Sequence, residues 1–131
     1  METASPSIAR IRACLDAPPG AVGGVEAQLS SYARFLYRVE RRGGQWRIAF
    51  FDSVYVRDEL VAALPGQVVP VSAADVAGYR TSYRMLCHLL SLTGYVPSQD
   101  LAGDDRPETA LAMAAEVYGW AGLEPDAPLG E

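Results

Sequence analysis

The stretch of sequence that decides the fold runs from residue 32 to residue 58 and reads YARFLYRVERRGGQWRIAFFDSVYVRD. Two glycines, Gly43 and Gly44, divide it, and a Gly-Gly pair is a strong signal for a two-residue hairpin turn. On either side of this turn apolar and polar residues alternate, which is the pattern of a β-strand with one buried face. The sequence therefore predicts two long antiparallel strands, over about 25–41 and about 46–59.

The turn also predicts which residues of the two strands face each other. It pairs Arg42 with Gln45, and a slip of one residue would move every side chain to the wrong face of the sheet. The remaining predicted pairs are Glu40–Arg47, Val39–Ile48, Tyr37–Phe50, Phe35–Asp52 and Ala33–Val54. Because the first strand is longer than most, we expect a bulge or bend near Ser30 and Ser31.

Outward from the hairpin, the pattern changes from period two to a helical period. Residues 7–15 are a further strand candidate, and the Pro- and Gly-rich residues 16–24 predict a loop. After residue 70, Ser72 is positioned to cap a short helix over 73–77, and a second helix is expected over about 79–93, ended by Gly94. Asp105-Arg-Pro-Glu108 has the form of a capping box, which predicts a last helix reaching residue 120 or 121.

The fold class expected from these elements is α+β, with an antiparallel sheet of about three strands and a long central hairpin, followed by C-terminal helices. A length of 131 residues fits a single domain spanning 1–131. Within it we place strands at about 7–60, a helical extension at about 72–122 and a frayed tail at 123–131.

Composition excludes several kinds of chemistry. All 11 basic residues are arginines, and the absence of lysine excludes a P-loop lysine and a Schiff base on a lysine. His88 is the one histidine, so a zinc site built on two histidines is excluded. The acidic residues at 100, 104 and 105 do not have the spacing of a calcium-binding loop. We therefore predict no metal and no cofactor, and we interpret the two cysteines as small buried thiols in a reducing compartment.

The charge distribution predicts no nucleic-acid partner. The formal net charge is −5, and the chain has no basic stripe long enough to neutralise a run of phosphates. It also has no apolar run of the roughly 20 residues that span a bilayer and no signal-peptide pattern. A cytoplasmic protein with no membrane partner is the expectation.

Asp52 is the leading candidate for a catalytic residue. In the predicted register it interrupts an apolar strand face, where loss of solvation favours a general acid or base. The alternative is a strand bulge that turns Asp52 outward, or a hydrogen bond to a backbone amide. The side chains predicted to line a ligand site around it are Phe35, Tyr37, Phe50 and Val54.

The hairpin at 32–48, followed by Asp52-Ser-Val-Tyr-Val-Arg-Asp58, resembles the final hairpin of SnoaL-like proteins of the nuclear transport factor 2-like superfamily. The stretch from Tyr83 to Pro107 resembles a helical extension of one bacterial branch, so the resemblance covers about residues 8–122. It implies a cone-shaped fold, in which a strongly curved antiparallel sheet encloses a small-molecule pocket. The N-terminal helices that close this pocket in the family have no counterpart in the sequence, so the chain is expected to be a partial or N-terminally truncated member.

The resemblance implies metal-free acid/base chemistry of an isomerase, cyclase or dehydratase type, acting on a small apolar cyclic metabolite. Asp52 would be the base. The alternative is a non-catalytic module that forms a homodimer or binds a partner through an uncovered apolar sheet face, since large apolar patches usually mark interfaces. A truncated family member without activity is the third possibility.

Overall fold

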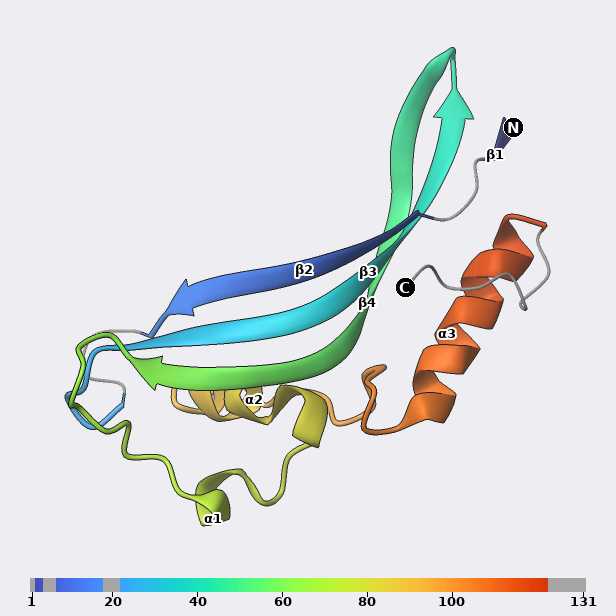
Figure 1. Cartoon of the computed structure of the whole chain (residues 1–131). Helices are drawn as coiled ribbons and strands as arrows, with labels where there is room; N and C mark the ends of the chain where they lie inside the picture. The colour runs from blue at the N-terminus through green and yellow to red at the C-terminus, as the bar shows by residue number, and fades with distance from the viewer. Residues whose placement is uncertain (1, 4–6, 18–21, 123–131) are drawn as a thin grey trace.

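The computed structural model describes residues 2–3, 7–17 and 22–122, and it has an α+β fold (Figure 1). This confirms the predicted α+β class with an antiparallel sheet and helices. The strands are β1 (Glu2–Thr3), β2 (Ser7–Asp16), β3 (Ala27–Arg42) and β4 (Gln45–Ala62), and the helices are α1 (Ala73–Val76), a 3-10 turn (Thr81–Tyr83), α2 (Arg84–Ser91) and α3 (Pro107–Trp120).

The sheet is antiparallel, and β3 is its central strand. β1 and β2 pair with one edge of β3, and β4 pairs with the other. The predicted hairpin is confirmed, because β3 and β4 meet at a turn in which Gly43 and Gly44 have φ values of 55° and 78°. Positive φ at both turn residues matches the right-handed twist of the strands and is strained for any residue with a side chain.

The predicted register holds next to the turn and changes beyond it. The pairs Arg42–Gln45, Glu40–Arg47 and Val39–Ile48 are confirmed, but shifts follow between Arg38 and Val39 and between Tyr32 and Ala33. Both insert one extra residue into β4, so the predicted bulge at residues 30–31 is misplaced. The pairings predicted for Phe35–Asp52, Tyr37–Phe50 and Ala33–Val54 are wrong; the structure has Leu36–Asp52, Tyr37–Phe51 and Ala33–Tyr55.

The two main helices pack on opposite faces of the sheet. Leu29 is fully buried in a cluster with Val22 and Leu89 of α2, whereas Leu36 is buried with Val54 and residues of α3. Since β3 shows no irregularity in its pairing with β2, Leu29 and Leu36, seven positions apart, point to opposite faces. The sheet is strongly twisted, and its far end, the β3–β4 turn with the flanking residues, projects beyond both helices (Figure 1).

The helix boundaries follow the sequence signals at some ends and not at others. The Ser72 backbone N–H donates to Asp75 Oδ2 over 2.8 Å, which forms the predicted cap of α1, and Gly94 has a φ of 83° just after α2. α2 itself begins at Arg84, later than predicted, because a 3-10 turn precedes it. α3 ends at Trp120 as predicted. The predicted tail at 123–131 lies outside the described residues. Of the two cysteines predicted to be buried, Cys87 is buried, but Cys14 is exposed.

The prediction that Asp105 caps α3 is wrong. The residue before the helix is Arg106, which makes no side-chain capping hydrogen bond. The Asp105 carboxylate instead accepts hydrogen bonds from Arg80 and Ser82. Arg80 is nearly buried, so its positive charge needs a partner within the protein. Its charge-assisted hydrogen bonds to the Asp105 carboxylate are stronger than those that the backbone N–H groups at the start of α3 could make.

Candidate functional site

A cavity of about 340 Å³ lies beside β4 and contains the predicted catalytic residue in its wall. Three elements contribute to it: the segment 51–55 of β4, the loop before α3, and α3 itself. Its lining residues are Phe51, Asp52, Ser53, Tyr55, Asp100, Leu101, Ala102 and Met113. Its wall thus combines aromatic and aliphatic side chains with two carboxylates, which suits a small molecule with an apolar body and a polar group.

The loop wall of the cavity is fixed to the outer edge of β4. The Tyr55 N–H donates to the Ala102 carbonyl over 3.0 Å, and the Asp104 N–H donates to the Tyr55 carbonyl over 2.9 Å. Two hydrogen bonds of 2.9 and 2.5 Å then join the Arg34 guanidinium to the Asp104 carboxylate. A bidentate pair of this kind sets orientation as well as distance, so the cavity is held between a strand and an anchored loop.

Asp52 shares one guanidinium with a second carboxylate. Arg38 Nη2 lies 3.2 Å from Asp52 Oδ2 and 3.1 Å from Glu116 Oε1. The Arg38 side chain is 14% exposed, and the Asp52 side chain is 28% exposed. The guanidinium also stacks 5.3 Å from the centre of the Phe50 ring. Asp52 is therefore oriented by an ion pair and is still open to the cavity, where it can accept a proton or a hydrogen bond.

Tyr55, which also lines the cavity, supplies a neutral hydroxyl group on the face of β4 opposite the Asp52 side chain. Burial, and secondarily the neighbouring Cys87, raise the pKa of Tyr55 above its ordinary value. Its ring packs 5.0 Å from the ring of Tyr83, which limits its movement. The phenol therefore stays protonated at neutral pH and can act as a hydrogen-bond donor.

The structure places the predicted ligand-lining residues on two faces of the sheet. Phe35 and Tyr37 pack against Phe51, with ring centres 5.7 and 6.2 Å away, on the face opposite Asp52. Val54 is buried against α3, and Phe50 is exposed under Arg38. Of the five predicted site residues, only Asp52 lines the cavity: the register shift puts Phe35 and Tyr37 on the other face, and Phe50 and Val54 lie on the face of Asp52 but outside the cavity wall.

Sequence reasoning missed most of the cavity wall. Phe51, Ser53 and Tyr55 alternate along one strand face, but their partners come from the loop at 100–102 and from Met113. The Asp-rich composition of that loop was a signal of exposure. It carried no information that the loop would bond to Tyr55, about 50 positions earlier in the chain.

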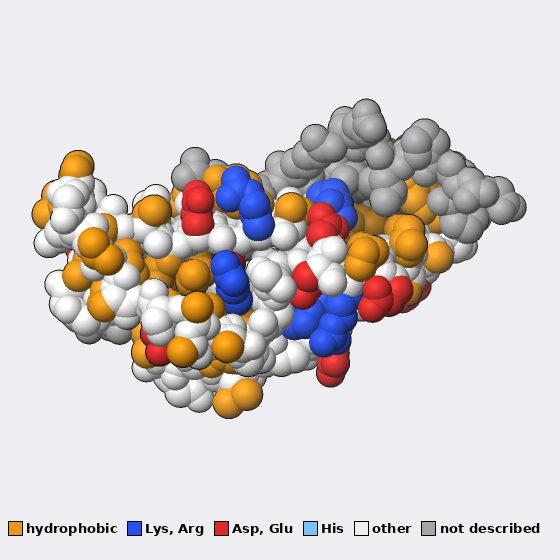
Figure 2. Space-filling model, turned by 60° about the horizontal axis from the view of Figure 1, so that its bottom comes forward, with side chains coloured by type: hydrophobic (Ala, Val, Ile, Leu, Met, Phe, Trp, Pro, Cys, Tyr) orange, Lys and Arg blue, Asp and Glu red, His pale blue; other side chains and the backbone are white. Residues whose placement is uncertain are grey.

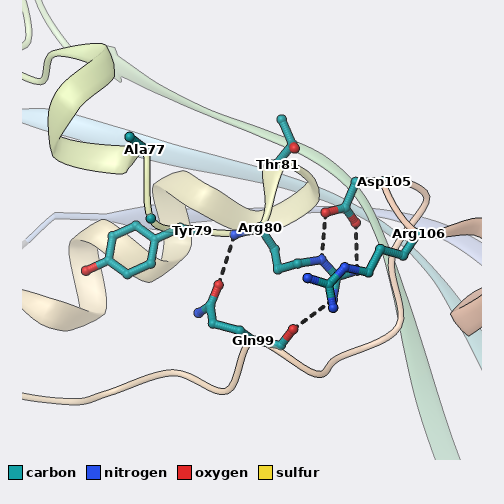
Figure 3. Close-up of a pocket in the computed structure, with 8 residues that line it drawn as sticks. Ala77, Tyr79, Arg80, Thr81, Gln99, Asp105 and Arg106 are labelled. Atoms are coloured by element: carbon teal, nitrogen blue, oxygen red, sulfur yellow. Dashed lines mark hydrogen bonds and ion pairs between the residues drawn. The ribbon is translucent and has the colours of Figure 1, made fainter.

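A second cavity, of about 320 Å³, lies near the start of the 3-10 turn and is shown in Figure 3. Arg80 is one of the residues that form its wall. The guanidinium donates to both oxygens of Asp105 over 2.7 and 2.8 Å, and to the carbonyls of Gln99 and Leu101 over 2.8 and 3.1 Å. The Arg80 side chain is 4% exposed and that of Asp105 is 14% exposed.

This second cluster has a structural role. The hydrogen bonds from Arg80, together with one from the Ser82 hydroxyl over 2.8 Å, hold the pKa of Asp105 well below its usual range. Four of the five guanidinium N–H groups of Arg80 donate to Asp105, Gln99 and Leu101, so the side chain is committed to contacts within the protein. The cluster ties the segment at 80–82 to the loop at 99–105, and that loop forms one wall of the Asp52 cavity.

Other kinds of site receive no support in the described part of the chain. Among residues 2–3, 7–17 and 22–122, no three metal-ligating side chains form a group that could hold an ion, and no helix is long and apolar enough to cross a bilayer. On the face shown in Figure 2, arginine and acidic side chains lie next to one another toward the middle of the surface.

Comparison with known proteins gave no assignment. No family model matches the chain, and no curated protein matches its sequence.

Proposed function

We propose that this chain is a SnoaL-like domain that binds a small molecule with an apolar cyclic body in the cavity beside Asp52. Asp52 would act there as the base in metal-free chemistry of an isomerase, cyclase or dehydratase type. One observation carries the proposal: a partly buried carboxylate, oriented by Arg38, lies in the wall of a cavity of about 340 Å³ together with aromatic side chains. The α+β class and the strongly twisted antiparallel sheet are compatible with a partial cone.

The chemistry would be proton transfer at a carbon next to a carbonyl group. Asp52 takes the proton, the C–H bonding pair moves toward the carbonyl to give an enolate, and Asp52 later returns the proton to the same or a neighbouring carbon. The negative charge that develops on the enolate oxygen would be stabilised by the Arg38 guanidinium, which lies on the same face of the sheet as Asp52. Arg38 keeps the Asp52 carboxylate oriented while its charge changes.

The test uses 1-tetralone, a bicyclic ketone, as a probe in D2O. Proton NMR measures whether the protein exchanges the hydrogens next to the carbonyl faster than buffer does. We expect Asp52→Asn to remove the acceleration, because the amide is not a base. Glu116→Gln is the matched control, since Glu116 also bonds Arg38 but does not line the cavity. Exchange at the buffer rate with the wild-type chain, or equal exchange with Asp52→Asn, would contradict the assignment of Asp52 as a base.

A second candidate function is self-association through the sheet, as a homodimer. The observation that favours it is the exposure of three large apolar side chains on one face of β4: Trp46 is 53% exposed, Ile48 59% and Phe51 59%. Clustered exposure of this size usually marks an interface. Size-exclusion chromatography with light scattering at 10–200 µM, a range of about twentyfold chosen to span weak dimers, should give twice the mass of the chain. A constant monomer mass would exclude this function.

A further inference from the structure

We infer that two copies of this chain pair through the open edges of their β4 strands, antiparallel, with Arg47 of one copy opposite Asp52 of the other. The inference rests on the proposed self-association, and it names the surface and the alignment. It concerns the projecting end of the hairpin, which neither helix covers (Figure 1).

The edge of β4 is closed at one position and open toward the turn. At Tyr55 the backbone N–H and C=O bond to the loop at 102–104, and this is the bridge that the described residues form on the outer side of β4. Backbone groups alternate in direction along a strand, so Ser53 and Phe51 direct theirs to this same edge. The open segment therefore extends from Gln45, where β4 begins, to Val54. Residues 51–53 of this segment border the cavity, so a partner strand would fill the cavity, and the pairing excludes the role of Asp52 as a base. An unpaired edge of this length is a template for another strand.

The sequence of the open segment is complementary to itself in the antiparallel direction. Residues 47–52 read RIAFFD. When a second copy is turned about a point between Ala49 and Phe50, Arg47 faces Asp52 of the partner subunit and Ile48 faces Phe51 of the partner subunit. Opposite charges and apolar side chains directly across a strand pair both stabilise a sheet. The point between residues 49 and 50 is also the middle of the open segment 45–54.

The bulge in β4 makes the side-chain faces fit this pairing. Ile48 pairs with Val39 and Phe51 pairs with Tyr37, so Ile48 and Phe51 lie on one face of the sheet although they are three positions apart. By the same register, Arg47 and Asp52 lie on the opposite face. Without the extra residue at Ala49, one member of each pair would point away from its partner.

Charge favours this neighbour at Asp52. Around it, the single positive charge of Arg38 meets two negative charges, those of Asp52 and Glu116. The arrival of Arg47 from the partner subunit would bring this group to neutrality, and it would do so twice in a symmetric dimer. Within one chain the Arg47 side chain donates to the Gln45 amide oxygen over 3.0 Å. This contact is exposed, so replacing it by an ion pair with Asp52 of the partner subunit costs little free energy.

The first experiment measures mass by light scattering for the wild type, Ile48→Lys and Leu111→Lys. We expect the wild type to be a dimer. We expect the dissociation constant of the Ile48→Lys dimer to be at least tenfold higher, since a lysine replaces the apolar partner of Phe51. Leu111→Lys is the control, because Leu111 is an apolar residue on α3 that is exposed to a similar degree as Ile48 (66% and 59%). It should remain a dimer. Circular dichroism of both variants shows whether each is folded.

The second experiment tests the alignment, and it does not depend on the folding of the lysine variant. In a Cys14→Ser background, with the buried Cys87 retained, tagged Ile48→Cys and untagged Phe51→Cys chains are mixed and oxidised. Directly opposed positions are within disulfide reach, so a mixed cross-link is expected. Trp46→Cys mixed with Phe51→Cys is the matched control, two positions out of register, and should cross-link at least tenfold less.

The outcomes separate the two proposals. A monomeric wild type overturns both the self-association and the strand pairing. A dimer without the 48–51 cross-link, or with the 46–51 cross-link formed equally well, overturns the β4 edge pairing and leaves self-association by another surface, such as the aromatic face around Phe35.

Discussion

The base of the sheet and its projecting end are built from the same two strands, but they are stabilised differently. At the base, Leu29 and Tyr83 are almost completely buried, and α2 and α3 cover the two faces. At the projecting end, Ile48 and Phe51 are each 59% exposed, and the contacts come mainly from the facing strand. The hydrophobic effect thus stabilises the base, whereas hairpin pairing maintains the projecting end, because little apolar surface is removed from water there.

This difference indicates where function and stability are separated. The Asp52 cavity lies at the boundary between the two regions, with one wall from β4 and another from the loop that Arg80 anchors. Changes at the base should therefore lower stability strongly, while changes at the projecting end should alter association or binding with small effects on unfolding.

The largest effect is expected from Arg80→Met, which removes the guanidinium from the second cluster. The Asp105 carboxylate then loses its partner in a nearly buried position, and breaking such a pair costs about 3–5 kcal/mol. Urea denaturation measures the loss. The control is Arg34→Met, which breaks the more exposed pair with Asp104 (26% and 38% exposed) and should cost about 0–1 kcal/mol. Equal losses for the two variants would contradict the structural role of the Arg80 cluster.

Leu29→Ala and Ile48→Ala compare apolar side chains of the two regions directly. Leu29 is fully buried between the sheet and α2, so its truncation leaves a cavity and should lower the free energy of unfolding by about 2–5 kcal/mol. Ile48 is mostly exposed, and its truncation should change stability by less than about 0.5 kcal/mol in the monomer. Thermal unfolding at low protein concentration gives both values. A large loss for Ile48→Ala would show that the projecting end has a covered core.

The sequence predicted those features that depend on neighbours along the chain. Gly43 and Gly44 predicted the turn and the first pairs of the register, and Ser72 predicted the start of α1. Alternation alone could not predict the extra residues in β4, because a bulge changes the face of every later side chain without changing the composition. Asp52 was thus assigned to the face of Phe35, although it lies on the face of Leu36.

Contacts between residues far apart in the chain could not be predicted from the sequence either. Asp105 has the local context of a helix cap, but its partner is Arg80, 25 positions earlier. Whether Asp105 caps α3 or pairs with Arg80 depends on where the loop at 99–105 lies relative to the 3-10 turn. Tertiary contacts such as the hydrogen bond between Tyr55 and Ala102 determine that position. The cavity wall at 100–102 could not be assigned for the same reason.

Acid is expected to weaken the base through Asp105. Its pKa is depressed in the folded protein, so its contribution to stability is complete above the ordinary value of 3.8 and is lost as the pH falls below it. Asp58 acts in the opposite direction, because burial raises its pKa. Denaturation between pH 6 and pH 2, a range of about four units around the ordinary value, should show a fall in stability that is reduced in Asp105→Asn. An unchanged pH dependence in that variant would exclude Asp105 as its source.

The smallest effect concerns two aspartates of β4, six positions apart: Asp58 lies at the base, and Asp52 lies where the projecting end begins. Asp58 accepts hydrogen bonds from the backbone N–H groups of Met85 and Leu86, over 3.2 and 2.8 Å, so it caps the first turn of α2 from the sheet. Removing a cap costs about 0.5–2 kcal/mol, and Asp58→Ala should fall in this range. Asp52→Ala breaks a partly exposed ion pair with Arg38 and should cost about 0–1 kcal/mol. If unfolding measurements found Asp52→Ala to be the more destabilising variant, Asp52 would be a structural residue, and the division between a stabilising base and a functional projecting end would fail at the residue where it matters most.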